Sequence, residues 1–160
     1  MAPEPHLPYT DDPNDMSEML QELRILLQGA QVLTAFLIVL PFSAGFSAIA
    51  EAEKWVYAVT FLSSLTSLIL FSAPAVHHRL QRPLQDRIAF KDFASRMMVV
   101  GLAPLSLSLV LATQLVTSEV IGEWPAAGLA AATAVFIVAV WFVLPLSRRR
   151  RLRRRGRSDA

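Results

Sequence analysis

Cysteine is absent from the 160-residue chain. That absence excludes disulfides, thiolate nucleophiles, cysteine-type zinc sites and iron–sulfur clusters. No spacing of glycines, carboxylates, serines or histidines matches a catalytic, metal-binding or nucleotide-binding motif. The sequence therefore predicts no catalytic residue, no metal site and no cofactor, and we expect a protein that is not an enzyme.

Charge is missing from long parts of the chain, although 18% of its residues are charged. No Asp, Glu, Lys or Arg lies between Arg24 and Glu51, Lys54 and Arg79, Arg96 and Glu119, or Glu123 and Arg148. Each of these stretches is long enough to cross the hydrocarbon core of a bilayer, which takes about 20 apolar residues in a helix. The mean hydropathy of the chain is +0.44.

These stretches predict an all-α integral membrane protein, an antiparallel four-helix bundle. Its transmembrane domain covers 29–146, with spans at about 29–50, 55–76, 97–118 and 125–146.

The segments outside the spans are polar. Residues 1–13 contain four prolines and several acidic residues, which is typical of a disordered tail. From Met16 to Leu27 apolar residues recur at helical spacing, so 14–28 should form an amphipathic juxtamembrane helix or an extension of the first span. Residues 147–160 are an Arg-rich tail.

Lys and Arg are distributed unevenly about the spans. Fourteen lie in the N-terminal segment, the middle loop and the C-terminal tail, which alternating spans place on one side, and only Lys54 lies on the other. The positive-inside rule then puts both termini in the cytoplasm, in a multi-pass protein of the bacterial cytoplasmic (plasma) membrane. The tail arginines directly follow the last span, where they fix topology and attract anionic lipid headgroups rather than nucleic acid. These arginines are Arg148, Arg149, Arg150, Arg151, Arg153, Arg154 and Arg155.

Two features of the spans bear on helix packing. Small residues recur four apart, a spacing that lets helix backbones approach closely in lipid, although abundant alanine and serine explain it equally well. The pairs are Ser43/Ser47, Ala44/Ala48, Ser63/Ser67 and Gly128/Ala132. Pro41 removes a backbone donor within the first span, and we expect the hydroxyl of Ser43 to satisfy the freed carbonyl.

One group of polar residues forms a candidate site at the cytoplasmic ends of the first two spans. Arg24, Gln28 and Gln31 share one helix face by their spacing. The second span ends at the same depth with two histidines and an arginine, and Glu22 is placed to pair with Arg79 or Arg82. The candidate polar site comprises Glu22, Arg24, Gln28, Gln31, His77, His78 and Arg79.

Two interpretations of this site stay open. It could be a cytoplasm-facing polar vestibule with His77 or His78 as a proton acceptor. The other interpretation, which we prefer, is an interface belt, because glutamine, histidine and arginine commonly end spans and bind headgroups. No span contains a carboxylate at its middle, which proton-coupled antiporters usually need.

The same residues carry a resemblance to a known family. The chain resembles, from Glu22 to about Gly101, a family of small bacterial membrane proteins catalogued as a domain of unknown function. The matching stretches are Glu22–Arg24, Leu27–Leu33, Phe36-Leu37, Pro41–Ser43, Ala73–Arg79 and Arg96–Gly101. The resemblance implies no established activity, and some relatives bear an automatic sodium–proton antiporter label.

Three functions follow, in order of preference. The first is a non-enzymatic accessory or partner-binding membrane protein. The second is a small oligomeric cation or proton transporter, and the third is a lipid-modifying membrane enzyme, for which no nucleophile or paired carboxylate is evident. Its expected partners are the lipid bilayer, anionic headgroups, and a second copy of the chain or another membrane protein.

Overall fold

The computed structural model describes residues 13–46, 50–80 and 87–144. The long helices are α1 (Pro13–Val39), α2 (Glu51–Leu80), α3 (Arg87–Ile121) and α4 (Glu123–Val138). The short 3-10 helix η1 (Leu40–Phe42) follows α1, and the π-helical turn η3 (Ala139–Val143) continues α4. No strand occurs within the described ranges, so the all-α class is confirmed. Residues 1–12 of the predicted tail and all the arginines of 147–160 lie outside the described residues.

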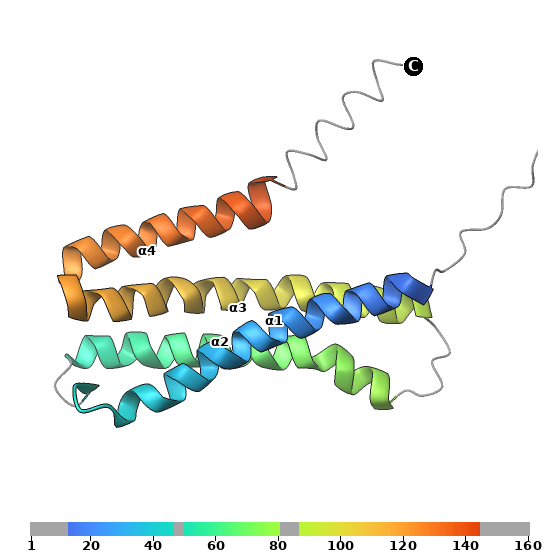
Figure 1. The fold of residues 1–160 in the computed structure, drawn as a ribbon, viewed down its shortest axis with the longest axis horizontal. Helices are drawn as coiled ribbons and strands as arrows, with labels where there is room; N and C mark the ends of the chain where they lie inside the picture. The colour runs from blue at the N-terminus through green and yellow to red at the C-terminus, as the bar shows by residue number, and fades with distance from the viewer. Residues whose placement is uncertain (1–12, 47–49, 81–86, 145–160) are drawn as a thin grey trace, which may run out of the picture.

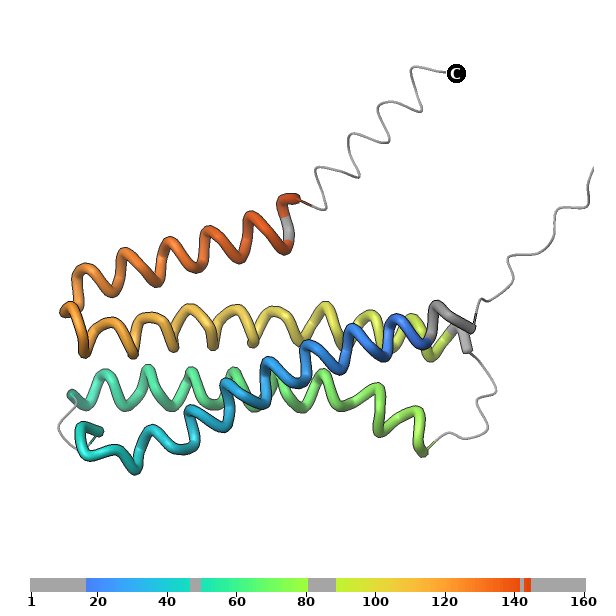
Figure 2. Tube along the Cα trace, in the orientation of Figure 1, coloured from blue at the N-terminus to red at the C-terminus, as the bar shows by residue number. Residues whose placement is uncertain are grey.

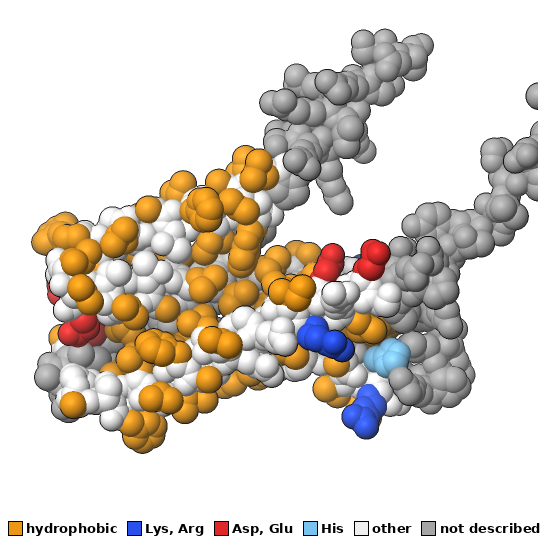
Figure 3. Space-filling model, viewed as in Figure 1, with side chains coloured by type: hydrophobic (Ala, Val, Ile, Leu, Met, Phe, Trp, Pro, Cys, Tyr) orange, Lys and Arg blue, Asp and Glu red, His pale blue; other side chains and the backbone are white. Residues whose placement is uncertain are grey.

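Each of the four long helices is long and apolar enough to cross a membrane. The candidate spans are Ser17–Phe42, Glu51–Leu80, Ala89–Ile121 and Glu123–Trp141. Large apolar side chains are exposed along all of them, Val32 to 73% and Val135 to 69%. Figure 3 shows hydrophobic side chains along the middle of the visible face and charged ones toward its two ends. Such a surface is stable in hydrocarbon and costly in water, so the four helices fit a membrane protein.

The helix boundaries differ from the predicted spans. The segment 14–28, which the sequence predicts as a juxtamembrane helix or an extension of the first span, is part of α1, which continues through it without a break as far as Val39. The first helix then stops well short of residue 50. At their polar ends α2 and α3 extend beyond the apolar stretches, since backbone hydrogen bonding continues where hydropathy falls.

Pro41 explains where α1 ends. Proline has no N–H, so the carbonyl of Leu37, four residues earlier, lacks its intrahelical donor. The hydroxyl of Tyr57 donates to that carbonyl at 2.9 Å, whereas Ser43 donates to the carbonyl of Leu40 at 2.7 Å. The expectation that Ser43 satisfies the carbonyl freed by Pro41 is therefore wrong. Tyr57 thus ties the end of α1 to the start of α2.

The helices form an open row rather than a closed ring. Figure 1 shows α2 and α3 side by side, with α4 beyond α3, and α1 crossing α2 and α3 obliquely; the tube in Figure 2 follows the same path. Within the described residues, α4 contacts only α3 among the long helices, and α1 contacts α2 and, less extensively, α3. Gly122, with a φ of 87°, makes the turn from α3 into α4. Helix α2 is the element that joins α1 to the rest.

One stripe of α2 is buried, and its N-terminal half is made of hydroxyl residues. The buried positions recur at helical spacing and comprise Thr60, Ser64, Ser67, Phe71 and Pro74. Ser64 lies 2.6 Å from the hydroxyl of Thr34 on α1, and Ser108 on α3 donates to the carbonyl of Thr60 at 3.0 Å. Hydrogen bonds between hydroxyls and carbonyls of neighbouring helices hold membrane helices together where no hydrophobic effect acts between them.

The C-terminal half of the stripe packs through apolar contacts. The ring of Phe71 is 1% exposed and forms a core cluster with Ala30 and Leu105. A methyl group at Gly101 would lie 2.6 Å from Cε1 of Phe71, so only glycine fits opposite the ring. Trp141 of η3 packs against the same cluster, which brings the end of α4 to the core.

Candidate functional site

A pocket between α1 and α2 brings two of the candidate polar residues together. We call it the α1–α2 pocket, and its volume is ≈ 390 Å³. Its lining residues are Leu20, Leu23, Arg24, Leu27, Phe71, Ala75 and His78. Arg24 comes from the first turns of α1 and His78 from the last turns of α2. The predicted convergence of these two residues at one depth is present in the structure.

The histidines at the end of α2 are held by aromatic rings of α3. The ring of His77 stacks on Phe90, with centroids 6.2 Å apart, and lies 4.6 Å from the centroid of Phe93. The ring of His78 meets Phe90 at 60°, with centroids 5.5 Å apart. Phe90 is buried, so it fixes both imidazoles between α2 and α3. Of the two histidines, His78 lines the α1–α2 pocket and His77 does not.

The other candidate polar residues do not converge. Gln28 and Gln31 are exposed on the face of α1 that points away from α2, since Leu23, Ala30 and Thr34 occupy the buried face. Glu22 and Arg79 are also exposed, and no ion pair joins them within the described residues. Arg82, the other suggested partner of Glu22, lies outside those residues. Gln28 and Gln31 thus lie on an exposed side of α1, whereas Arg24, predicted to share their face, lines the α1–α2 pocket.

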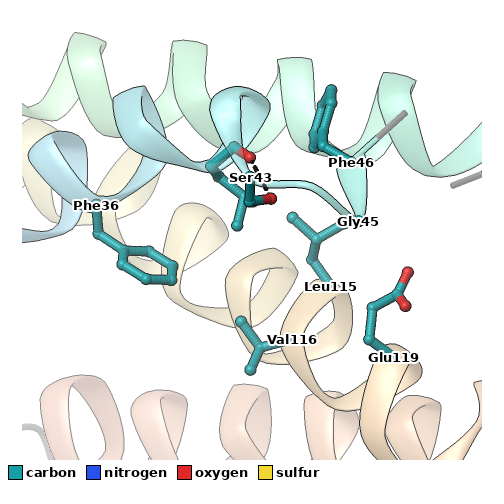
Figure 4. A pocket seen from close by; sticks show the side chains of 8 residues that line it. Phe36, Ser43, Gly45, Phe46, Leu115, Val116 and Glu119 are labelled. Carbon is teal, nitrogen blue, oxygen red and sulfur yellow. Dashed lines mark hydrogen bonds between the residues drawn. The ribbon is translucent and has the colours of Figure 1, made fainter. Parts of the chain in front are cut away.

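A second pocket, which the sequence did not indicate, lies between the end of α1 and α3 (Figure 4). We call it the α1–α3 pocket, and its volume is ≈ 250 Å³. It is lined by Phe36, Leu40, Ser43, Gly45, Phe46, Leu115, Val116 and Glu119. Glu119 supplies the carboxylate of an otherwise mostly apolar wall. Pro41 lies between the lining residues Leu40 and Ser43, where α1 ends, so the proline is the signal in the sequence that could have indicated this pocket.

The buried polar groups offer little for catalysis. Among the described residues the buried polar side chains are Thr34, Thr60, Ser64, Ser67 and Ser108. The hydroxyl of Ser67 has no hydrogen-bond partner there. No group of three His, Asp or Glu residues within the described ranges could hold a metal ion. The arrangement can bind and orient a ligand at the α1–α2 pocket through a guanidinium, an imidazole and an apolar wall.

Comparisons with known proteins give the family of the chain. Neither the curated proteins nor the solved structures contain a match to it. The model of a family of unknown function, DUF6328, matches residues 13–145, a range that includes all four long helices and both pockets. The match carries no activity and gives no support to an antiporter label. Because it covers most of the sequence, the chain belongs to this family of unknown function, DUF6328.

Proposed function

We propose that the protein is a non-enzymatic, multi-pass protein of the bacterial cytoplasmic membrane that acts by binding another membrane protein or a second copy of itself. In this proposal its four helices cross the bilayer antiparallel to one another, with both termini in the cytoplasm. The excess of Lys and Arg in the N-terminal segment, middle loop and tail supports that orientation. Trp55 and Trp124 are exposed in the first turns of α2 and α4, away from the proposed cytoplasmic side. Tryptophan is common at membrane interfaces, so these positions suit the outer one.

The observation that carries the proposal is the outward-facing pair Gln28 and Gln31. Both side chains are exposed, and both lie within the candidate span Ser17–Phe42. With Arg24 at the headgroup level, Gln31 lies about 10 Å deeper, because an α-helix rises about 1.5 Å per residue. A carboxamide at that depth has two donors and an acceptor that hydrocarbon cannot satisfy.

A neighbouring helix would satisfy these carboxamides. Polar side chains hydrogen-bonded between membrane helices contribute about 0.6 kcal/mol on average and up to about 2 kcal/mol. Ala35 follows Gln31 by four residues on the same exposed face of α1, and Gly29, next to Gln28, is also exposed, with nothing within 4 Å of a Cβ placed there. Small side chains beside the glutamines leave room for close approach of a second helix. The partner is therefore expected to offer hydrogen-bonding groups in the inner leaflet.

No observation favours the transporter alternative. A proton or cation pathway through the membrane is normally marked by an ionisable residue in the interior of the helices. Within the described ranges, the buried polar residues are serines and threonines only. The exposed glutamines serve an interface between proteins without any such pathway.

Site-directed photocrosslinking in native membranes tests the proposal. A benzoylphenylalanine at Val32, which is 73% exposed beside Gln28 and Gln31, probes the outward face without removing either glutamine. The matched probe replaces Val135, 69% exposed on α4. We expect a discrete protein adduct from position 32 that is absent from position 135.

A second substitution shows whether the glutamines make the contact. The position-32 adduct should weaken by about threefold or more in Gln31→Leu, since loss of one interhelical hydrogen bond of about 0.6 kcal/mol changes association about threefold. Adducts to lipid alone at both positions would overturn the proposal. An adduct of twice the monomer mass would identify a second copy as the partner.

A further inference from the structure

We propose that the α1–α2 pocket binds one anionic phospholipid. The phosphate would lie against Arg24 and His78, and an acyl chain would lie along the apolar wall toward Phe71. This site is lined by neither Gln28 nor Gln31 and does not depend on the proposed partner contact.

The shape of the pocket suits part of a lipid. Its volume of ≈ 390 Å³ falls among pockets that hold small molecules, which measure about 300–1,000 Å³. Apart from Arg24 and His78, its lining is apolar: Leu20, Leu23, Leu27, Phe71 and Ala75. A membrane-facing pocket with such a wall fills with hydrocarbon rather than water, because water finds too few polar partners there.

The two polar residues have donors to spare. Arg24 forms no ion pair or hydrogen bond within the described part of the chain, and its guanidinium carries five N–H donors suited to a phosphate. His78 makes a ring contact with Phe90, and an imidazole donates from a ring N–H in either protonation state. One donor comes from each helix, so a single phosphate can bridge α1 and α2.

The order of these groups along the helices matches the polarity of a phospholipid. His78 lies near the polar end of α2, and Phe71 lies about 10 Å closer to the membrane interior, at about 1.5 Å per residue. Figure 3 shows basic, acidic and histidine side chains at this end of the molecule, next to the hydrophobic belt. A headgroup at Arg24 and a chain toward Phe71 would therefore lie parallel to the lipids of the surrounding leaflet.

Native mass spectrometry of the full-length protein measures the binding. The protein is released from nanodiscs that contain phosphatidylglycerol and phosphatidylcholine with identical acyl chains, and the retained lipids are counted. We expect one phosphatidylglycerol to be retained in preference to phosphatidylcholine. Arg24→Gln should reduce that preference about fivefold, which equals about 1 kcal/mol, the attraction of one basic residue to anionic lipid.

Matched variants separate a specific site from general attraction. Arg79→Gln removes the same charge one residue from His78, but Arg79 does not line the pocket, so its retention should equal that of the unmodified protein. Ala75→Leu fills the apolar wall and should lower retention of the lipid, whereas Val76→Leu, also exposed on α2, should not. Ala75→Leu keeps the test informative if Arg24→Gln does not fold.

Three results would overturn the proposal. The first is equal retention of the two lipids. The second is an equal loss in Arg24→Gln and Arg79→Gln, which would indicate a diffuse surface charge. The third is displacement of the lipid by millimolar inorganic phosphate, which would show that the site recognises a phosphate group without the chain. If no protein crosslinks to position 32 but the lipid is still retained, only the proposal of a protein partner is contradicted.

Discussion

At the residue scale, the buried polar side chains of the described chain are hydroxyl groups of serine and threonine. Thr34 donates its hydroxyl proton to the carbonyl of Ala30 at 2.8 Å, which leaves Ser64 to donate to Thr34. A serine or threonine carries one proton and two acceptor sites, so it can bond its own helix and a neighbour together. Together with the bond from Ser108 to the carbonyl of Thr60, these contacts join α1, α2 and α3 without a buried charge, which would cost several kcal/mol in hydrocarbon.

The contact between Gly101 and Phe71 gives a sharp prediction. Gly101→Ala should lower the free energy of unfolding, because a Cβ there would lie 2.6 Å from the Phe71 ring. Overpacking of this kind costs about 1–3 kcal/mol, more than the roughly 1 kcal/mol that alanine gains over glycine in a helix. Denaturation in mixed micelles measures the change.

Two controls accompany that measurement. Gly29→Ala meets nothing within 4 Å and should leave stability unchanged or slightly raised. In a Phe71→Leu background the alanine at 101 should cost less than in the unmodified chain. An equal cost in both backgrounds would show that the ring is not the obstacle.

The sequence indicated that Arg24 and His78 lie near each other, but it did not show that Gln28 and Gln31 face outward. Arg24 and His78 could be brought together from sequence, because consecutive spans that run in opposite directions place their polar ends at one depth. The outward turn of Gln28 and Gln31 could not be predicted, since α1 carries apolar residues on every side within the membrane. Only the packing of Ala30 and Thr34 on α2 shows which face is buried.

At the element scale, the charge-free stretches predicted the existence of all four helices but not their ends. Hydropathy reports where a chain meets lipid, whereas a helix continues as long as its backbone bonds are made. The exception is α1, which Pro41 ends at a point that hydropathy does not mark. The small pairs were an uncertain guide: Ser67 is buried on α2, but Gly128 and Ala132 are exposed on α4.

Helix α4 should be sensitive to substitution along one narrow strip. Ala126 is fully buried against the adjacent helix and α4 contacts only α3 among the long helices of the described chain, so Ala126→Leu should push the two apart. We expect a loss of about 1–3 kcal/mol in unfolding free energy. Ala127→Leu, exposed one residue away, is the matched control and should be tolerated. Equal stability of the two variants would argue that α4 does not rest on this strip.

At the scale of the whole molecule, the proposed orientation can be tested on a chain that has no cysteine of its own. Ala52 and Arg79 are exposed near opposite ends of α2, so Ala52→Cys and Arg79→Cys report the two sides of the membrane. In intact cells an impermeant maleimide should label position 52 at once and position 79 only after the membrane is opened. The reverse pattern would place both termini outside.

The oblique crossing of α1 has a mechanical consequence. The contact of Thr34 with Ser64 lies between the two pockets, with the α1–α2 pocket toward one end of α1 and the α1–α3 pocket toward the other. A helix that tilts as a rigid body about a fixed contact moves its two ends in opposite directions. A tilt of α1 about this contact would move Leu23 and Phe36 in opposite directions, so we expect the volumes of the two pockets to change together.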